Sequence, residues 1–220
     1  HANISTVKKR LIALVVVSAV AAMPARAQEA GPRTWSIVPH ADGNLGLAFS
    51  LGWTLGTHEG KASEVTGSVQ ARLEPLAIAQ GEFRVPIAAM STGSASRDCH
   101  MREALGLDYT RSRFPKEHVC VDDRVPASGP DAVVFPDIVV RMRGLQPGPT
   151  ALLELSTHGK TNQVSAPVRL QRIGPDVQVQ TEFELKLADF GITVIMPPLM
   201  RVADHITVRL NVLLREVKTR

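Results

Sequence analysis

The chain has 220 residues, with 25 lysines and arginines against 21 aspartates and glutamates. Four of the basic residues and none of the acidic ones lie within residues 1–27, so the remainder of the chain is electrically neutral. A neutral chain without a basic run lacks the electrostatic surface that binds nucleic-acid phosphates. We therefore expect no nucleic-acid partner, and about 190 residues remain for a single domain with a sizeable core.

The amino-terminal segment is typical of a secretory signal peptide. Three basic residues at 8–10 precede the apolar run 11–23, and Ala25-Arg26-Ala27 follows it. A basic region, a short apolar region and a small-x-small cleavage site mark exported proteins. The apolar run is shorter than the roughly 20 residues that a membrane-spanning helix needs. We expect a cleaved signal over residues 1–27, one domain over residues 28–220 and no integral membrane span after cleavage.

Apolar and polar residues alternate along much of the remaining chain. This period of two, with one apolar and one polar face, is typical of antiparallel strands that cover a core on one side. Strands are expected at residues 45–53, 65–73, 81–90, 138–142, 153–157, 166–170, 177–187 and 206–214. Clusters of turn-forming residues occur at 57–61, 127–131, 146–149, 174–176 and 197–198.

One stretch predicts a helix. After the strand at 81–90 comes a turn of small residues at 91–95, and residues 97–107 then read as a short helix. Ser96 is the expected N-cap, and Asp98 in the first turn suits the positive end of the helix dipole. About eight strands and one helix can bury their apolar faces as a sandwich or as a closed barrel, and periodicity does not distinguish the two.

The two cysteines leave three alternatives open. Cys99 and Cys120 can form a disulfide in an exported protein, which would close a loop of about 20 residues and contribute roughly 3 kcal/mol. They can instead be unpaired and buried. Together with His100 and His118 they also supply the thiolate and imidazole ligands that zinc prefers, although the spacing is not that of the usual zinc sites.

The sequence gives no positive support for catalysis. It lacks a Gly-x-Ser-x-Gly nucleophile motif, a His-Glu-x-x-His metal motif and a glycine-rich phosphate loop. We predict that the protein is not an enzyme and requires no cofactor.

Several segments resemble the YceI-like family in the same order along the chain. They are Trp35-Ser36-Ile37-Val38, residues 47–51, Val65-Thr66-Gly67, residues 81–90, Ser91-Thr92-Gly93, Arg97-Asp98-x-His100-Met101, Phe114-Pro115, Thr157-His158-Gly159-Lys160-Thr161 and Ala188-Asp189-Phe190-Gly191-Ile192. The resemblance covers roughly residues 34–217. It implies an all-β, lipocalin-like antiparallel barrel of about eight strands with one short helix, in a periplasmic protein that binds polyisoprenoid lipids.

From this resemblance we expect a non-enzymatic carrier of an isoprenoid or similar apolar lipid in the barrel lumen. The lining residues we predict are Phe49, Leu51, Trp53, Phe83, Val85, Ile87, Phe183 and Leu185. Arg97, Asp98 and His100 could contact a polar head group at the mouth of the barrel. Alternatively, Asp98 caps its helix and Arg97 is a solvated or ion-paired surface residue. Two other functions remain open, a metal- or redox-responsive protein and a solidly packed structural or interaction barrel. A homodimer is compatible with the resemblance.

Overall fold

The computed structural model describes residues 31–39, 46–73, 76–106, 135–194 and 199–218. The predicted signal peptide, the predicted turns at 127–131 and 197–198, His118 and Cys120 all lie outside these ranges.

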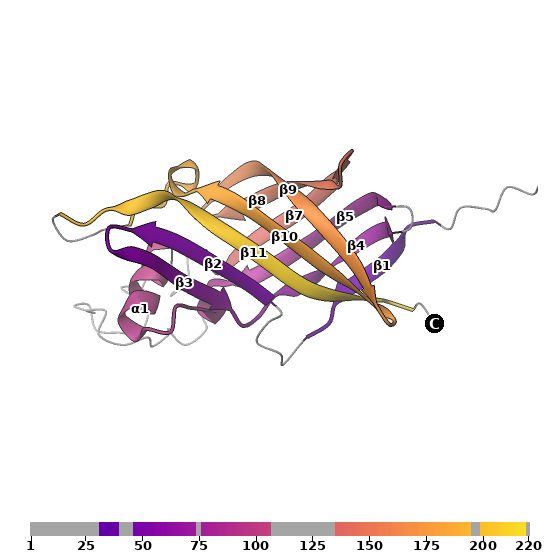
Figure 1. Ribbon diagram of the computed structural model, residues 1–220, viewed down its shortest axis with the longest axis horizontal. Coiled ribbons are helices and arrows are strands. Elements are labelled where there is room, and N and C mark those ends of the chain that lie inside the picture. Colours follow the sequence, from indigo (N-terminus) through magenta and orange to yellow (C-terminus); the bar gives the residue numbers. More distant parts are fainter. Residues whose placement is uncertain (1–30, 40–45, 74–75, 107–134, 195–198, 219–220) are drawn as a thin grey trace, which may run out of the picture. The chain divides into compact units, whose positions relative to one another are not determined.

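The described chain is almost entirely β-structure (Figure 1). The strands are β1 (Arg33–Ile37), β2 (Gly46–Trp53), β3 (Gly56–Ala62), β4 (Thr66–Leu73), β5 (Leu76–Pro86), β6 (Met90–Ser91), β7 (Asp137–Gln146), β8 (Thr150–Thr157), β9 (Lys160–Ile173), β10 (Asp176–Lys186) and β11 (Val202–Glu216). The helices are α1 (Ala95–Ala104) and the short 3-10 turns η1 (Ile87–Ala89) and η3 (Leu187–Phe190).

The strands form a closed antiparallel barrel of eight strands, which confirms the predicted fold class. The ring runs β1-β4-β5-β7-β8-β9-β10-β11 and closes where β1 pairs with β11. Strand β11 pairs with β10 from His205 to Arg215 on one side. On its other side it pairs first with β2 and then with β1, so these two short strands share one long partner. Strands β3 and β6 extend the sheet beyond β2.

Three details of the predicted elements are wrong. Residues 57–61 belong to strand β3 and not to a turn, because β3 pairs with β2 from Leu47 opposite Ala62 to Trp53 opposite Gly56. The strand expected at 81–90 is divided into β5, η1 and β6. The N-cap of α1 is Ser94, two residues before the expected Ser96.

Among the residues that the structure describes, apolar side chains of the barrel gather in three clusters. The first centres on β1, β4 and the end of β11, with Trp35, Val69 and Leu214 at most 5% exposed. The second and third lie where α1 and η3 meet the strands. Phe49 and Met90 belong to the second cluster, and a third group forms around Leu155, Phe190 and Ile192. Helix α1 contributes to both of these, because Met101 packs on the second cluster and Leu105 on both.

Two ladders of the barrel wall stop before their strands end. The β9–β10 ladder ends at Val168 opposite Thr181. Val168 donates its N–H towards β8, to the carbonyl of Pro149. The backbone nitrogen of the preceding residue, Pro167, therefore faces β10, but it has no hydrogen to donate. The β5–β7 ladder ends at Gly81 opposite Met142.

Two buried charged residues hold α1 to the segment before it. Asp98 and Arg102 are 2% and 5% exposed. Asp98 Oδ1 accepts hydrogen bonds from the backbone N–H and the hydroxyl of Thr92, at 2.5 and 2.6 Å, and Oδ2 accepts one from the hydroxyl of Ser91 at 2.7 Å. Arg102 donates to the carbonyl oxygen of Met90 at 3.0 Å. The predicted first-turn acid therefore fixes the helix to the end of β6.

These contacts set the ionisation of Asp98. Burial alone would raise the pKa of its carboxyl group, but the hydrogen bonds from Thr92 and Ser91, with the nearby charge of Arg102, outweigh burial and lower the pKa. The carboxylate form is therefore favoured by folding.

We expect Asp98→Asn to lower the free energy of unfolding by about 2 kcal/mol near neutral pH, since hydrogen bonds to an ionised group are lost. Because the folded pKa lies below the unfolded one, this stability is present above about pH 4 and is lost as the pH falls through the folded value. Urea unfolding from neutral to acidic pH should therefore show the difference from wild type shrinking. Asp189→Asn, at an exposed position of η3, is the control and should change little. A difference that stays constant with pH would contradict this role.

Candidate functional site

The predicted lining residues fall into three groups. Phe49, Val85 and Ile87 are buried, at 7%, 2% and 0% exposure, and the first two belong to the second core cluster. Phe83 packs against the first cluster and Leu185 against the third. These five side chains are part of the packed core, and whether they contact a ligand stays a prediction.

The other three predicted residues lie outside the core clusters. Leu51 and Phe183 are half-buried and point to the inner face by the alternation of their strands. Trp53 lies at the end of β2 and stacks on His58, with the ring centroids 4.7 Å apart and the rings inclined by 14°. Trp53 is therefore placed at the tip of the β2–β3 hairpin, where it can border a mouth of the barrel but not its centre.

A belt of inward-facing residues lies between the clusters. Leu153 alternates with the buried inner residues of β8, and Val168 and Thr181 face each other across the β9–β10 ladder. With Phe183 they retain partial exposure although they point into a closed ring. Inward-facing residues that are only partly buried belong to the less tightly packed part of the described lumen. We call Leu153, Val168, Thr181 and Phe183 the middle belt.

One polar atom interrupts the middle belt. The hydroxyl oxygen of Thr181 is buried and has no hydrogen-bond partner. Polar atoms are seldom buried in this way, because an unmade hydrogen bond costs about 1–3 kcal/mol. Sequence reasoning placed Leu153 and Val168 on apolar strand faces but did not select them as lining. Their position halfway along the lumen depends on the register of the closed ring.

Two of the charged residues expected near a mouth, Arg97 and Asp98, share Thr92 as a hydrogen-bond partner. Asp98 is buried in the contacts that hold α1, whereas His100 is exposed and lies 3.5 Å from Glu103. Arg97 is exposed and donates hydrogen bonds to Thr92. Burial, and then the charge of Arg97, lower the pKa of His58 on β3, which sequence reasoning did not select. The structure thus brings Arg97 towards His58 and Trp53.

The structure narrows the alternatives for the cysteines, because none of the described residues is a free cysteine. Cys99 is fully buried in α1. Cys120 and His118 lie outside the described residues, so the disulfide and the zinc site both stay predictions. Within the described ranges, no group of three or more His, Cys, Asp or Glu residues is placed to hold a metal ion. In the same ranges no helix is long and apolar enough to cross a bilayer.

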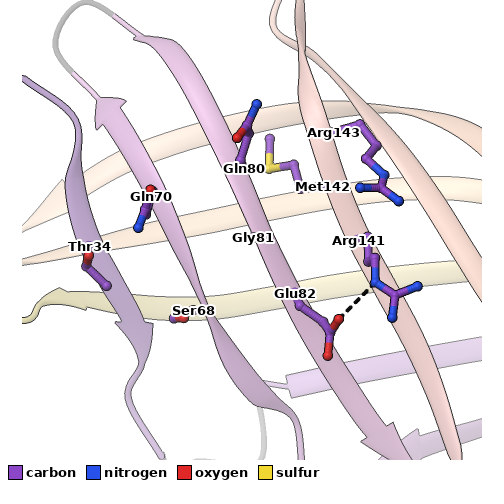
Figure 2. A pocket seen from close by; sticks show the side chains of 9 residues that line it. All are labelled: Thr34, Ser68, Gln70, Gln80, Gly81, Glu82, Arg141, Met142 and Arg143. Carbon is purple, nitrogen blue, oxygen red and sulfur yellow. Dashed lines mark hydrogen bonds and ion pairs between the residues drawn. The ribbon is translucent and has the colours of Figure 1, made fainter.

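A hollow of about 460 Å³ lies on the outer wall where β1, β4, β5 and β7 run side by side (Figure 2). It is lined by Thr34, Ser68, Gln70, Gln80, Gly81, Glu82, Arg141, Met142 and Arg143. Most of these are polar residues from the outer faces of their strands. Sequence reasoning did not predict this hollow.

Ion pairs surround one side of the hollow. Arg141 lies 2.9 Å from Glu82, and Arg143 lies 2.8 Å from Glu154. Hydrogen bonds from Arg84 and Arg141 lower the pKa of Glu82, and those from Arg143 do the same for the pKa of Glu154. Both carboxylates are thus held in their charged form next to the guanidinium groups.

Comparison with known proteins identifies the family. Residues 35–214 match the model of the YceI-like domain. No curated protein sequence matches the chain.

Solved structures share this fold at low sequence identity. A polyisoprenoid binding domain from Saccharophagus degradans, described as implicated in plant cell wall breakdown, is 12% identical over 83% of this chain and 98% of that one, with a TM-score of 0.55. BcnA from Burkholderia cenocepacia is 12% identical over 76% of this chain and 94% of that one, with a TM-score of 0.54. The YCEI protein of Campylobacter jejuni is 12% identical over 74% and 86%, with a TM-score of 0.52. From the family model and the barrel, we conclude that this chain belongs to the YceI-like domain family.

Proposed function

We propose that this protein binds the apolar chain of an isoprenoid or similar long lipid in its barrel, as a non-enzymatic carrier in the periplasm. The observation that carries the proposal is the middle belt. Its residues point into a closed ring and are only partly buried, which supports a lumen that can take up a slender ligand against a lining made mostly of hydrocarbon.

The chemistry of this lining favours an apolar ligand. Leu153, Val168 and Phe183 offer only hydrocarbon surface, and burying each methylene of a ligand against such surface is worth about 0.8 kcal/mol. An eight-stranded barrel has room for one small or slender ligand. Family membership and the polyisoprenoid-binding domain among the similar structures support the same class of ligand.

Export supports the location that we propose. Signal-like residues 1–27 would direct the chain out of the cytoplasm. A homodimer and the absence of catalysis stay predictions. If the middle belt instead repacks in solution to fill the lumen, the protein would be a structural or interaction barrel.

Native mass spectrometry tests the proposal directly. Protein extracted with organic solvent should gain the mass of one prenyl lipid per chain when it is mixed with that lipid. Protein that is always empty and takes up no prenyl chain would contradict the proposal.

A pair of neighbouring substitutions locates the binding site in the lumen. Thr181→Phe fills the middle belt and removes an unpartnered hydroxyl, so we expect lipid occupancy to fall at least about tenfold with little loss of stability. Gln180→Phe places the same ring on the exposed outer face of β10 and should leave occupancy unchanged. Thermal unfolding checks that both variants are folded. Equal occupancy in the two variants would place the lipid elsewhere.

Thiol titration separates the carrier from the metal- or redox-responsive alternative. We predict a disulfide between Cys99 and Cys120, so the unfolded, unreduced protein should show no free thiol. After reduction it should show both, and its free energy of unfolding should fall by roughly 3 kcal/mol. Two free thiols before reduction would exclude the disulfide and favour the zinc site.

A further inference from the structure

A bulge in β7 explains why β5 and β7 separate. Met142 pairs with Leu153 of β8, but Gly144 pairs with Leu152, so Arg143 is an extra residue in β7. Such a bulge bends its strand and changes which side chains face inward. Arg143 is exposed, whereas Leu145, two residues further, packs against the first core cluster. The β5–β7 ladder ends at Met142, immediately before the bulge.

The hollow described above lies at this separation. Gly81, where the pairing of β5 with β7 ends, has no side chain. A Cβ there would meet the backbone of Ser68 and Val69 in β4. Figure 2 shows the Met142 side chain between β5 and β7, beside Gln80. The hollow therefore lies where the β5–β7 ladder ends, and Gly81 contributes no side chain to it.

Met142 connects the hollow with the inside of the barrel. It lines the hollow, packs against the first core cluster and pairs with Leu153 of the middle belt. Methionine has three rotatable bonds and adapts to neighbouring groups more easily than branched residues do. The flexible side chain of Met142 would thus lie between a ligand chain in the lumen and the hollow.

Polar groups at the rim are free to bind a ligand. Within the described part of the chain, the side chains of Gln70 and Gln80 make no hydrogen bond, and neither do the hydroxyls of Thr34 and Ser68. Together they offer amide donors, carbonyl acceptors and hydroxyls from three adjacent strands.

The charges at the rim favour a neutral ligand group. Arg141 contacts both Glu82 and Glu154, at 2.9 and 3.6 Å, and Arg143 binds Glu154 through two nitrogens. Each guanidinium group already has a carboxylate partner. A phosphate would have to compete with these carboxylates for the arginines and would be repelled by them.

We propose that the hollow at the β5–β7 separation binds the neutral, hydrogen-bonding head group of the lipid, whose chain passes Met142 into the lumen. This inference rests on the proposed function, since it assigns the head-group site of the same ligand. It also names the ligand class, an apolar chain with an uncharged carbonyl or hydroxyl head.

Three probes with the same prenyl chain test this proposal: the alcohol, the hydrocarbon without a head group and the diphosphate. Affinities are measured by competition against a fluorescent fatty probe. We expect the alcohol to bind about tenfold more tightly than the hydrocarbon, because two neutral hydrogen bonds contribute about that factor. The diphosphate should bind less tightly than the alcohol.

The double variant Gln70→Ala/Gln80→Ala should bind the alcohol about tenfold less tightly and the hydrocarbon as wild type does. Both positions are solvent-facing, so folding should be unaffected. The control is Gln171→Ala/Gln180→Ala, two exposed glutamines on the outer faces of β9 and β10, and it should behave as wild type.

The outcomes separate the two proposals. If the alcohol and the hydrocarbon bind equally, if the diphosphate binds most tightly, or if the double variant keeps the preference for the alcohol, the head-group site is wrong while lumen binding stands. If neither the hydrocarbon nor the alcohol binds, the proposed function fails, and the head-group site fails with it.

Discussion

The barrel depends on β11, the strand that closes the ring. It pairs with β10 over eleven residues and, on its other side, with β2 and β1 in succession. Closure directs the apolar faces of the eight strands towards the inside of the barrel. It also removes the exposed edge strands that an open sheet would have. The core clusters at the two ends and the partly filled middle belt both follow from this single constraint.

The two short ladders modify this ring without opening it. Pro167 ends one because it cannot donate to β10, and the bulge at Arg143 ends the other. The wall is therefore hydrogen-bonded over most of its length, and the strands separate locally where these two ladders end. A ligand could bind at such a separation. The separation beside Met142 coincides with the hollow on the outer wall and with the polar side chains at its rim.

Much of the fold could be predicted from the sequence because period-two alternation is a direct consequence of a half-buried sheet. The runs ending at Leu187 and Leu214 correspond to β10 and β11 for this reason. Strand β3 was missed because its segment, Gly-Thr-His-Glu-Gly-Lys-Ala, has no alternating apolar residues. Pairing with β2 holds it in place, and Gly60 leaves room for the ring of Phe49.

The candidate site was less predictable for physical reasons. Alternation indicates which side of a strand is apolar but not how far along the lumen a residue lies. It therefore did not distinguish Val85, which is fully buried, from Leu153, which is only partly buried. The outer hollow depends on an extra residue in β7 and on Gly81, whose close contact with β4 arises only from the pairing of distant segments.

The most direct test of the central claim is a crystal structure of the protein with a bound prenyl alcohol. This account predicts electron density for the chain inside the barrel, in contact with Leu153, Val168 and Phe183. A lumen filled by the protein's own side chains, with the lipid bound outside or not at all, would contradict it.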